Sequence, residues 1–307
     1  MPVSDPPSTP AAPTPARIRA AIRRLQELPG WYPTVQKSLT LSVDPRADSY
    51  QLQVGLTVEP SVAARVLALA NSPYFDVEPA SKTIPEVIAG LDHKQLRELL
   101  RLLLVSGLLD SLAGEGAVMD EIRKMSTATG AAAYQIARNT DCGNPTELLG
   151  VGLLHPAADF ALARSFPENY DAMLELFGTM PTKEAERIAF GMDVPEIGRW
   201  LTEGWSFPRI YSEAAENWPQ PLQASSDPSL RRRLCAVHVA VRLADGLIAG
   251  LGLDSLDIDP GILGDLRLGP AEIEMVWHEL PEQIAQLDEI FTTDPPTVES
   301  AAEDSVG

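Results

Sequence analysis

The chain is poor in the residues that build covalent cross-links and metal sites. Its 307 residues include 2 cysteines, Cys142 and Cys235, and 4 histidines. Two cysteines form neither a disulfide framework nor a zinc site, so we expect buried free thiols in a reducing compartment. His93, His238 and His278 have no partner at metal-ligand spacing, and surface or structural roles are expected for them.

Positive charge is scarce as well. Lys and Arg number 24 against 43 Asp and Glu, which gives a formal net charge of -19. Such an excess of acid keeps a protein in solution and repels phosphate backbones, so the sequence predicts no broad binding to nucleic acid. The net charge does not exclude a local basic patch.

Long apolar runs and export signals are also missing. The most apolar run, Leu99 to Leu109, is too short to span a bilayer and contains Arg101. The amino terminus has neither a basic start followed by an apolar segment nor a small-residue cleavage site. We therefore expect a cytoplasmic protein without membrane insertion.

The sequence has no nucleophile elbow, no phosphate-binding loop and no dinucleotide-binding glycine pattern. It also lacks the alternating pattern of strands joined by hairpin turns, and shows no repeat at periods of 20 to 50 residues. What it has instead is helical periodicity in every long segment. The predicted fold class is all-α.

Amino-acid composition predicts where the folded part of the chain begins and ends and where it divides into two lobes. Residues 1–15 hold 6 prolines and predict a disordered leader, while the acidic residues 292–307 predict a disordered tail. Between them, residues 113–116 read Ala-Gly-Glu-Gly. This break predicts an amino-terminal lobe over 16–115 and a second helical lobe over 116–291.

Helical spacing, caps and proline positions predict individual helices. The predicted ranges are 17–28, 50–57, 60–70, a short helix after Thr83, 93–112, 118–139, 146–164, 167–177, 182–190, 194–205, 207–218, 230–251 and 272–291. The first is amphipathic and basic, and it either presents a solvated face or lies against the body or a partner. Residues 219–228 predict a loop.

The stretch from Val58 to Leu91 is the most informative. A helix opens with Pro60 in its first turn, stops at Asn-Ser-Pro-Tyr, and a second short helix ends in Gly-Leu. This order resembles the most recognisable segment of the HDOD family, a bacterial signalling module related to the HD metal phosphohydrolases. Weaker similar phrases occur at 28–35, 153–155, 191–201 and 205–208.

The resemblance covers residues 17–291 and implies an amino-terminal helical lobe packed on a distorted HD-like lobe. Family members are regulatory output modules that usually lack enzymatic activity. HD enzymes hold a divalent metal with a His, a His-Asp pair and a later Asp. The resemblance places the pair at His155 and Pro156, the upstream His near Met125 or Ser126, and the later Asp at Asp245.

Of these four metal positions, only two, His155 and Asp245, keep the residue type of a ligand. Other imidazoles used by relatives would lie near Asn217 and Trp218, where the sequence has none, and Pro195 also stands where a His is often found. Two ligands far apart in sequence rarely hold a catalytic metal. The sequence predicts no metal, no cofactor and no catalysis, with His155 and Asp245 as vestiges of the site.

The surviving polar residues have simpler readings. His155 and Asp159 are spaced i, i+4 and can form a local hydrogen bond or ion pair instead of a metal site. Asp245 can bond a neighbouring helix terminus. The three arginines at 231–233 either bind phosphate or form a solvated face.

Three functions stay open. The first is a non-catalytic module of bacterial signal transduction that binds an unidentified protein, with Trp31, Tyr32, Tyr74 and Phe75 as aromatic anchors. Core packing is the competing role for Tyr74 and Phe75. The second is a residual phosphohydrolase acting on nucleotides or cyclic dinucleotides, and the third is a sensor whose former metal pocket binds a small effector.

Overall fold

The structure is a computed structural model that describes residues 10–25, 32–41, 56, 60–75, 80–205 and 207–292. Over these residues it is built from helices, as predicted, and the only β contact is an isolated bridge between Phe177 and Met180.

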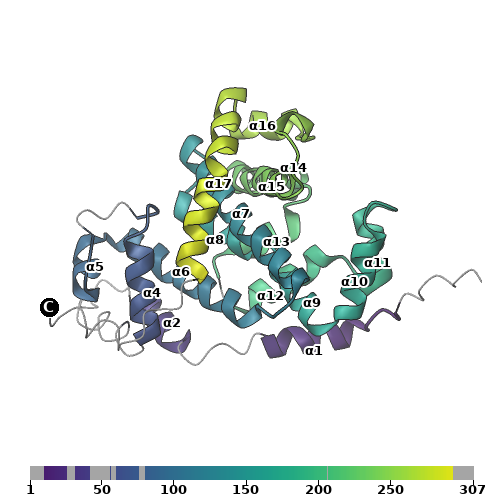
Figure 1. Cartoon of the computed structure of the whole chain (residues 1–307), viewed down its shortest axis with the longest axis horizontal. Helices are drawn as coiled ribbons and strands as arrows, with labels where there is room; N and C mark the ends of the chain where they lie inside the picture. Colours follow the sequence, from purple (N-terminus) through teal and green to yellow (C-terminus); the bar gives the residue numbers. More distant parts are fainter. Residues whose placement is uncertain are drawn as a thin grey trace, which may run out of the picture.

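The described helices follow one another along the whole chain. They are α1 Pro15–Leu25, α2 Tyr32–Leu41, α4 Pro60–Ala70, α5 Ile84–Gly90, α6 His93–Leu112, α7 Ala117–Asn139, α8 Pro145–Leu154, α9 Ala157–Ser165, α10 Pro167–Leu176, α11 Thr182–Phe190, α12 Val194–Gly204, α13 Arg209–Asn217, α14 Pro221–Ala224, α15 Pro228–Ile248, η1 Leu253–Ser255, α16 Pro260–Leu266 and α17 Pro270–Thr292. In Figure 1, α2, α4 and α5 lie at the left, α10 and α11 at the right, and α15 and α16 at the top.

Local chemistry explains why most boundaries match the prediction. Thr83 and Asp92 accept hydrogen bonds from the first turns of α5 and α6, and Asp92 forms a capping box with Gln95. Asn144 caps α8 in the same way, and Gly191 ends α11 in the left-handed conformation. The sequence carries these signals locally, so they are readable without a fold.

The predicted helices lack one break and three short helices, and several of their ends differ from the observed ends by two or three residues. The helix predicted over 146–164 is two helices, because Pro156 lacks an N–H and the chain turns at His155 and Pro156 between α8 and α9. The loop predicted over 219–228 contains α14, and η1 and α16 were missed because they are too short to show a period. The helix predicted over 50–57 lies outside the described residues, except for Leu56.

The amino-terminal lobe is organised around α6. One long helix buries leucines on most of its circumference, and α2 and α4 pack against it. Asn71 closes the loop after α4, because its side chain exchanges two hydrogen bonds of 2.7 Å with the backbone of Ser81. The Asn-Ser-Pro-Tyr phrase therefore has a structural use.

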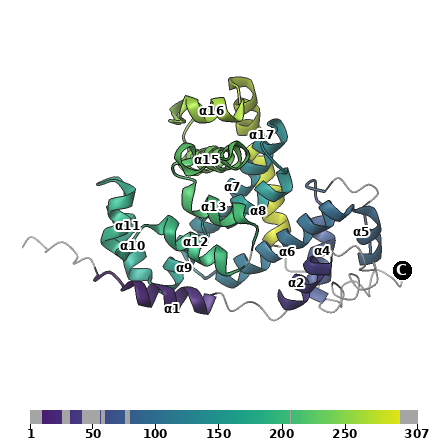
Figure 2. The same cartoon turned by 180° about the vertical axis from the view of Figure 1, so that it is seen from behind.

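Helix α1 packs on helices that come much later in the chain, although it lies in the predicted first lobe, residues 16–115. It contacts α9 and α12, and buries Ile18 and Ile22 (Figure 2). Arg19 lies 4.5 Å above the ring of Trp200, so part of the basic face is not simply solvated. Residues 10–14, which precede it, have no regular secondary structure, and Asn169 donates a hydrogen bond of 3.2 Å to the carbonyl of Ala11.

Helices α7 and α8 form the tightest pair in the molecule and fix the carboxy-terminal lobe. Gly152 of α8 lies directly on α7: a Cβ there would stand 2.7 Å from the carbonyl oxygen of Thr129 and 2.9 Å from the Cα of Gly130. Only glycine allows this approach. It places His155, three residues later, at a defined position beside α7.

The two lobes are joined by α17, which packs on α7 and also reaches α4. Tyr74, after α4, donates a hydrogen bond of 3.4 Å to the carbonyl of Gln283 and meets Tyr134 of α7 edge to face. Across the described residues, none of the helices combines the length and apolar character that spanning a bilayer requires.

The two cysteines are buried and unpaired, as predicted. The three arginines do not form a solvated face. Arg231 pairs with Asp265 at 2.6 Å, Arg232 donates to the carbonyls of Asp265 and Asp141, and Arg233 reaches Glu147 at 3.4 Å. They tie α15 to its neighbours, which leaves no free basic patch there.

Candidate functional site

The carboxy-terminal lobe contains a cavity of about 440 Å³, here called the HD cavity. It lies between α7, the turn from α8 to α9, α10, α11, the start of α12, and α15. Five positions singled out by the sequence resemblance line it together: Met125, His155, Pro156, Trp218 and Asp245. Pro195 lines it as well. The fold therefore brings together the positions that the resemblance predicted from distant segments.

His155 is held at the wall of the HD cavity as a neutral side chain. It is only 9% exposed, and its Nδ1 lies 2.8 Å from the carbonyl oxygen of Gly152, so Nδ1 carries the proton and donates it. Burial lowers the pKa of His155 to about 4. At neutral pH its Nε2 is then a free acceptor, with no hydrogen-bond partner in the part of the chain that the structure describes.

The predicted bond between His155 and Asp159 does not form. Because the helix breaks at Pro156, His155 bonds back to Gly152, and Asp159 accepts a hydrogen bond of 2.9 Å from the hydroxyl of Tyr170 on α10. Burial raises the pKa of Asp159 to about 6, although the Tyr170 bond opposes the rise. Asp159 is therefore a carboxyl that titrates close to neutral pH.

Glu186 is a site residue that the sequence analysis missed. It is 8% exposed, lines the HD cavity from α11, and accepts a hydrogen bond of 3.0 Å at Oε2 from the backbone N–H of Val194. Burial, together with nearby Asp159 and Asp193, raises its pKa to about 7. The available signal was weak: a Glu on the apolar face of an amphipathic helix, between Ala185 and Ala189.

The remaining wall is aromatic and partly open. Trp218 packs edge to face against His155 with ring centroids 6.1 Å apart, and its carbonyl oxygen lies 2.9 Å from Nδ1 of His238 on α15. His238 thus has the structural role predicted for it. Glu121 and Asp245 stand at more exposed positions, and Asp245 faces Arg242 at 4.0 Å.

Comparison with known proteins gives the family. The model of the HDOD domain matches residues 28–221, which is more than half of the chain. The chain belongs to the HDOD domain family. The match begins later and ends earlier than the predicted 17–291, so α15 to α17 lie beyond it. Among curated proteins, no relative matches.

Solved structures share this HDOD fold. An HDOD domain protein of unknown function from Geobacter sulfurreducens has a TM-score of 0.67 at 20% identity, over 91% of this chain and 99% of that one. A candidate signal transduction protein from Marinobacter aquaeolei VT8 has a TM-score of 0.64 at 19% identity, and the match covers 91% of this chain and 65% of that one. A candidate phosphohydrolase from Shewanella amazonensis SB2B has 0.59 at 19%, over 88% and 98%.

The HD cavity of this HDOD protein does not offer the donor set of a metal centre. Among the described residues, no three His, Cys, Asp or Glu side chains come close enough to hold one ion. Met125 and Pro156 supply no ligand at two inherited positions, and Asp245 is engaged with Arg242. These residues do not fit a bound divalent metal of the HD type.

The aromatic anchors predicted for a partner are not gathered at one surface. Tyr74 and Phe75 are 4% and 3% exposed, so the structure places both in the core, which was the competing role. Trp31 lies outside the described residues, and Tyr32 is described only as the first residue of α2. Neither of these two gives a contact from which an interface can be argued.

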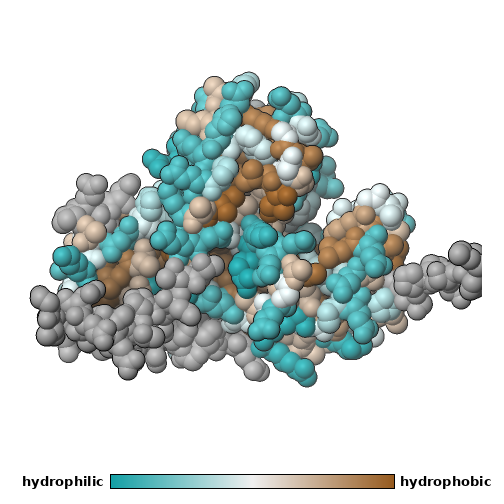
Figure 3. All heavy atoms as spheres, in the orientation of Figure 1, coloured by the Kyte–Doolittle hydropathy of each residue, from teal (hydrophilic) through white to brown (hydrophobic). Residues whose placement is uncertain are grey.

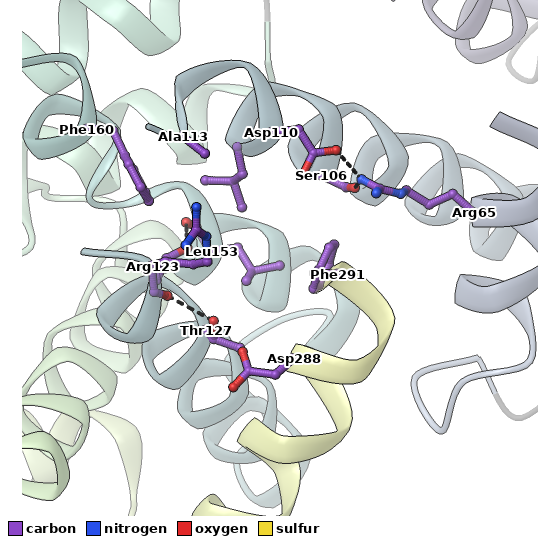
Figure 4. Close-up of a pocket in the computed structure, with 12 residues that line it drawn as sticks. Arg65, Ser106, Asp110, Ala113, Arg123, Thr127, Leu153, Phe160, Asp288 and Phe291 are labelled. Carbon is purple, nitrogen blue, oxygen red and sulfur yellow. Dashed lines mark hydrogen bonds and ion pairs between the residues drawn. The ribbon is translucent and has the colours of Figure 1, made fainter. Parts of the chain in front are cut away.

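A second cavity, of about 490 Å³, lies where the two lobes meet and is here called the junction cavity (Figure 4). It is lined by side chains of α4, α6, α7, α8, α9 and α17. Its charged groups have partners: Arg65 donates to Ser106 and Asp110, Arg123 pairs with Asp120 at 2.9 Å, and Asp288 has a hydrogen bond from Thr127. Sequence reasoning did not find this cavity.

Proposed function

We propose that this HDOD protein is a non-catalytic regulatory module of bacterial signal transduction that acts by binding another protein. One observation carries the proposal: the positions of the HD metal site meet in one cavity, but Met125 and Pro156 occupy two of the four, and Trp218 stands near the place where some relatives use a further His. A scaffold kept without its reactive groups is suited to recognition. A similarly folded structure described as a candidate signal transduction protein supports the signalling role.

The residual phosphohydrolase is the alternative from another class. It requires His155 and Asp245 to share an ion. Nε2 of His155 is free for this, but Asp245 faces Arg242 at 4.0 Å, and Met125 and Pro156 supply no further ligand. The proposal predicts no turnover of nucleotides or cyclic dinucleotides by the full chain supplied with Mn²⁺, Fe²⁺ or Mg²⁺. Turnover that disappears in His155→Ala and in Asp245→Ala would establish the hydrolase instead.

Protein binding is tested separately. The tagged full chain is cross-linked in cells, and captured proteins are identified by mass spectrometry and then mixed as purified components with this chain. We expect at least one partner that binds the purified chain in a reciprocal capture. Capture that yields no partner surviving this second step would contradict the protein-binding part of the proposal, whatever the turnover assay shows.

A further inference from the structure

Four carboxylates line the HD cavity, and only Asp245 belongs to the inherited metal pattern. Asp159 and Glu186 stand on its inner wall, and Glu121 and Asp245 stand at more exposed positions. Among the described residues that line it, Arg242 is the only arginine or lysine. Burying a carboxylate without a cationic partner costs stability, so such groups mark functional sites more often than chance.

The polar atoms left unused in this cavity accept hydrogen bonds. Glu186 is more than nine-tenths buried, and only its Oε2 is bonded, to the N–H of Val194; Oε1 has no partner among the described residues. His155 is buried to the same degree and offers Nε2 as a second free acceptor. The hydroxyl of Tyr170 is already committed to Asp159. A complementary ligand must therefore donate hydrogen bonds.

The charge of the HD cavity and the residues of its walls narrow the chemical class of the ligand further. Four carboxylates against one arginine repel a phosphate or a nucleotide. The same carboxylates attract a cation, and Trp218, Tyr170 and Phe177 line the cavity with aromatic rings, a side-chain type that binds cations. A volume of about 440 Å³ accommodates a small organic molecule.

We propose that the HD cavity binds a small organic cation through a primary ammonium group. The ammonium donates to Oε1 of Glu186 and Nε2 of His155, while its carbon chain packs on Trp218 and Met125. The site is distinct from protein binding: it makes the former metal pocket a sensor for amines, and it stands whether or not a protein partner is found.

The test is isothermal titration of the full chain at low ionic strength. The probes are 1,5-diaminopentane, tetramethylammonium, which has the charge but no N–H donor, and inorganic phosphate. We expect the diamine to bind with a stoichiometry of one and about tenfold or more tighter than tetramethylammonium, with no binding of phosphate. Tryptophan fluorescence should change on binding and lose most of that change in Trp218→Phe.

Matched variants distinguish binding at a specific site from the general electrostatic attraction of a cation to an acidic protein. Glu186→Gln keeps an oxygen for Val194 but loses the charge, and should weaken diamine binding about tenfold or more. Glu184→Gln removes the same charge from the exposed face of the same helix and should leave affinity within about twofold. Asp245→Asn, at a more exposed position, provides a second variant if Glu186→Gln folds poorly.

Three results would overturn the proposal. The first is the absence of saturable diamine binding, and the second is an equal loss of affinity in Glu184→Gln and Glu186→Gln, which would show unspecific attraction. The third is saturable binding of Mn²⁺ that Glu186→Gln abolishes while the diamine does not bind, because the cavity would then be a metal site.

Discussion

The two cavities of this HDOD protein are similar in volume, about 490 Å³ at the junction and about 440 Å³ in the HD cavity, but differ in how their charges are compensated. At the junction, Arg65 and Arg123 each have an acidic partner. In the HD cavity, Glu186 and His155 keep atoms that no described residue engages. A charged side chain with an oppositely charged partner in the protein has a structural role, whereas a buried charged side chain without one indicates a ligand site.

Their surroundings differ too. The junction cavity lies between elements that one lobe alone does not supply, because α4 and α6 meet α7, α9 and α17 there (Figure 4). The HD cavity is formed within the carboxy-terminal lobe. Figure 3 also shows apolar surface gathered over α10 and α11, where Phe177 and Ile188 are 37% and 41% exposed. The HD cavity therefore opens beside an apolar face, and Phe177 belongs to both.

The largest effect is expected at the wall that the cavities share. Leu153 of α8 lines the junction cavity and His155 lines the HD cavity, and both depend on the contact of Gly152 with α7. Gly152→Ala forces a Cβ into that contact and should lower the free energy of unfolding by about 2–3 kcal/mol. Urea unfolding measures this change.

Gly264→Ala is the matched control. Gly264 lies in helix α16 with nothing within 4 Å of an added Cβ, so alanine there should leave stability unchanged or raise it by about 0.5–1 kcal/mol. Equal effects of the two substitutions would mean that the close approach of α7 and α8 does not govern the two cavities.

The next largest effect is a pH dependence of stability that we expect from the HD cavity and not from the junction cavity. Burial raises the pKa of Glu186 from its ordinary 4.5 to about 7, so the folded state binds more protons than the unfolded state between these values. Its contribution to stability is present at low pH and is lost as pH rises through about 7. Glu186→Gln should thus raise the free energy of unfolding by about 1–3 kcal/mol at pH 8 relative to wild type, and by much less at pH 5.

Asp159 acts in the same direction, with a pKa raised to about 6, so part of the slope should remain in the Glu186→Gln variant. Lys183 opposes the rise at Glu186, and Asp193 favours it. Glu184→Gln, at an exposed position, should leave the pH profile unchanged. A Glu186→Gln profile that runs parallel to wild type from pH 5 to 8 would contradict the assignment of an uncompensated carboxylate.

The smallest effect is expected at the junction. Arg65→Met keeps the apolar stem but leaves Ser106, which is fully buried, without its hydrogen bond from the arginine, and should cost about 1–2 kcal/mol. Arg123→Met removes an exposed i, i+3 pair from the same cavity and should cost less than about 0.5 kcal/mol. Neither should change diamine binding, and a changed affinity would show that the cavities are coupled.

Much of the helical layout was predictable because its signals are local. The stretch 93–112 was predicted with the observed bounds, since Asp92 caps its start and leucines recur through it. The break at Pro156 was missed because the apolar run on both sides continues at helical spacing. The short helices α14 and α16 were missed for the opposite reason, since each has too few residues for a period.

The site was only half predictable. The resemblance located Met125, His155, Pro156 and Asp245, which the fold then brought to one cavity. It did not point to Glu186 or Tyr170, because neither belongs to the inherited metal pattern. Whether a glutamate on an amphipathic helix faces water or a cavity depends on how α11 packs beside α12, and that packing is set by residues distant in sequence.

The sequence by itself determined that this is an all-helical HDOD protein whose inherited metal positions carry methionine and proline, because caps, periodicity and residue identity are properties of short segments. Tertiary structure decided which polar groups are compensated. In the folded chain the three arginines at 231–233 pair with groups on neighbouring segments, whereas one carboxylate oxygen of Glu186 has no partner among the described residues. The sequence could not show this, because hydrogen-bond partners come from other helices. Only the packed arrangement of those helices sets which buried charges remain to meet a ligand.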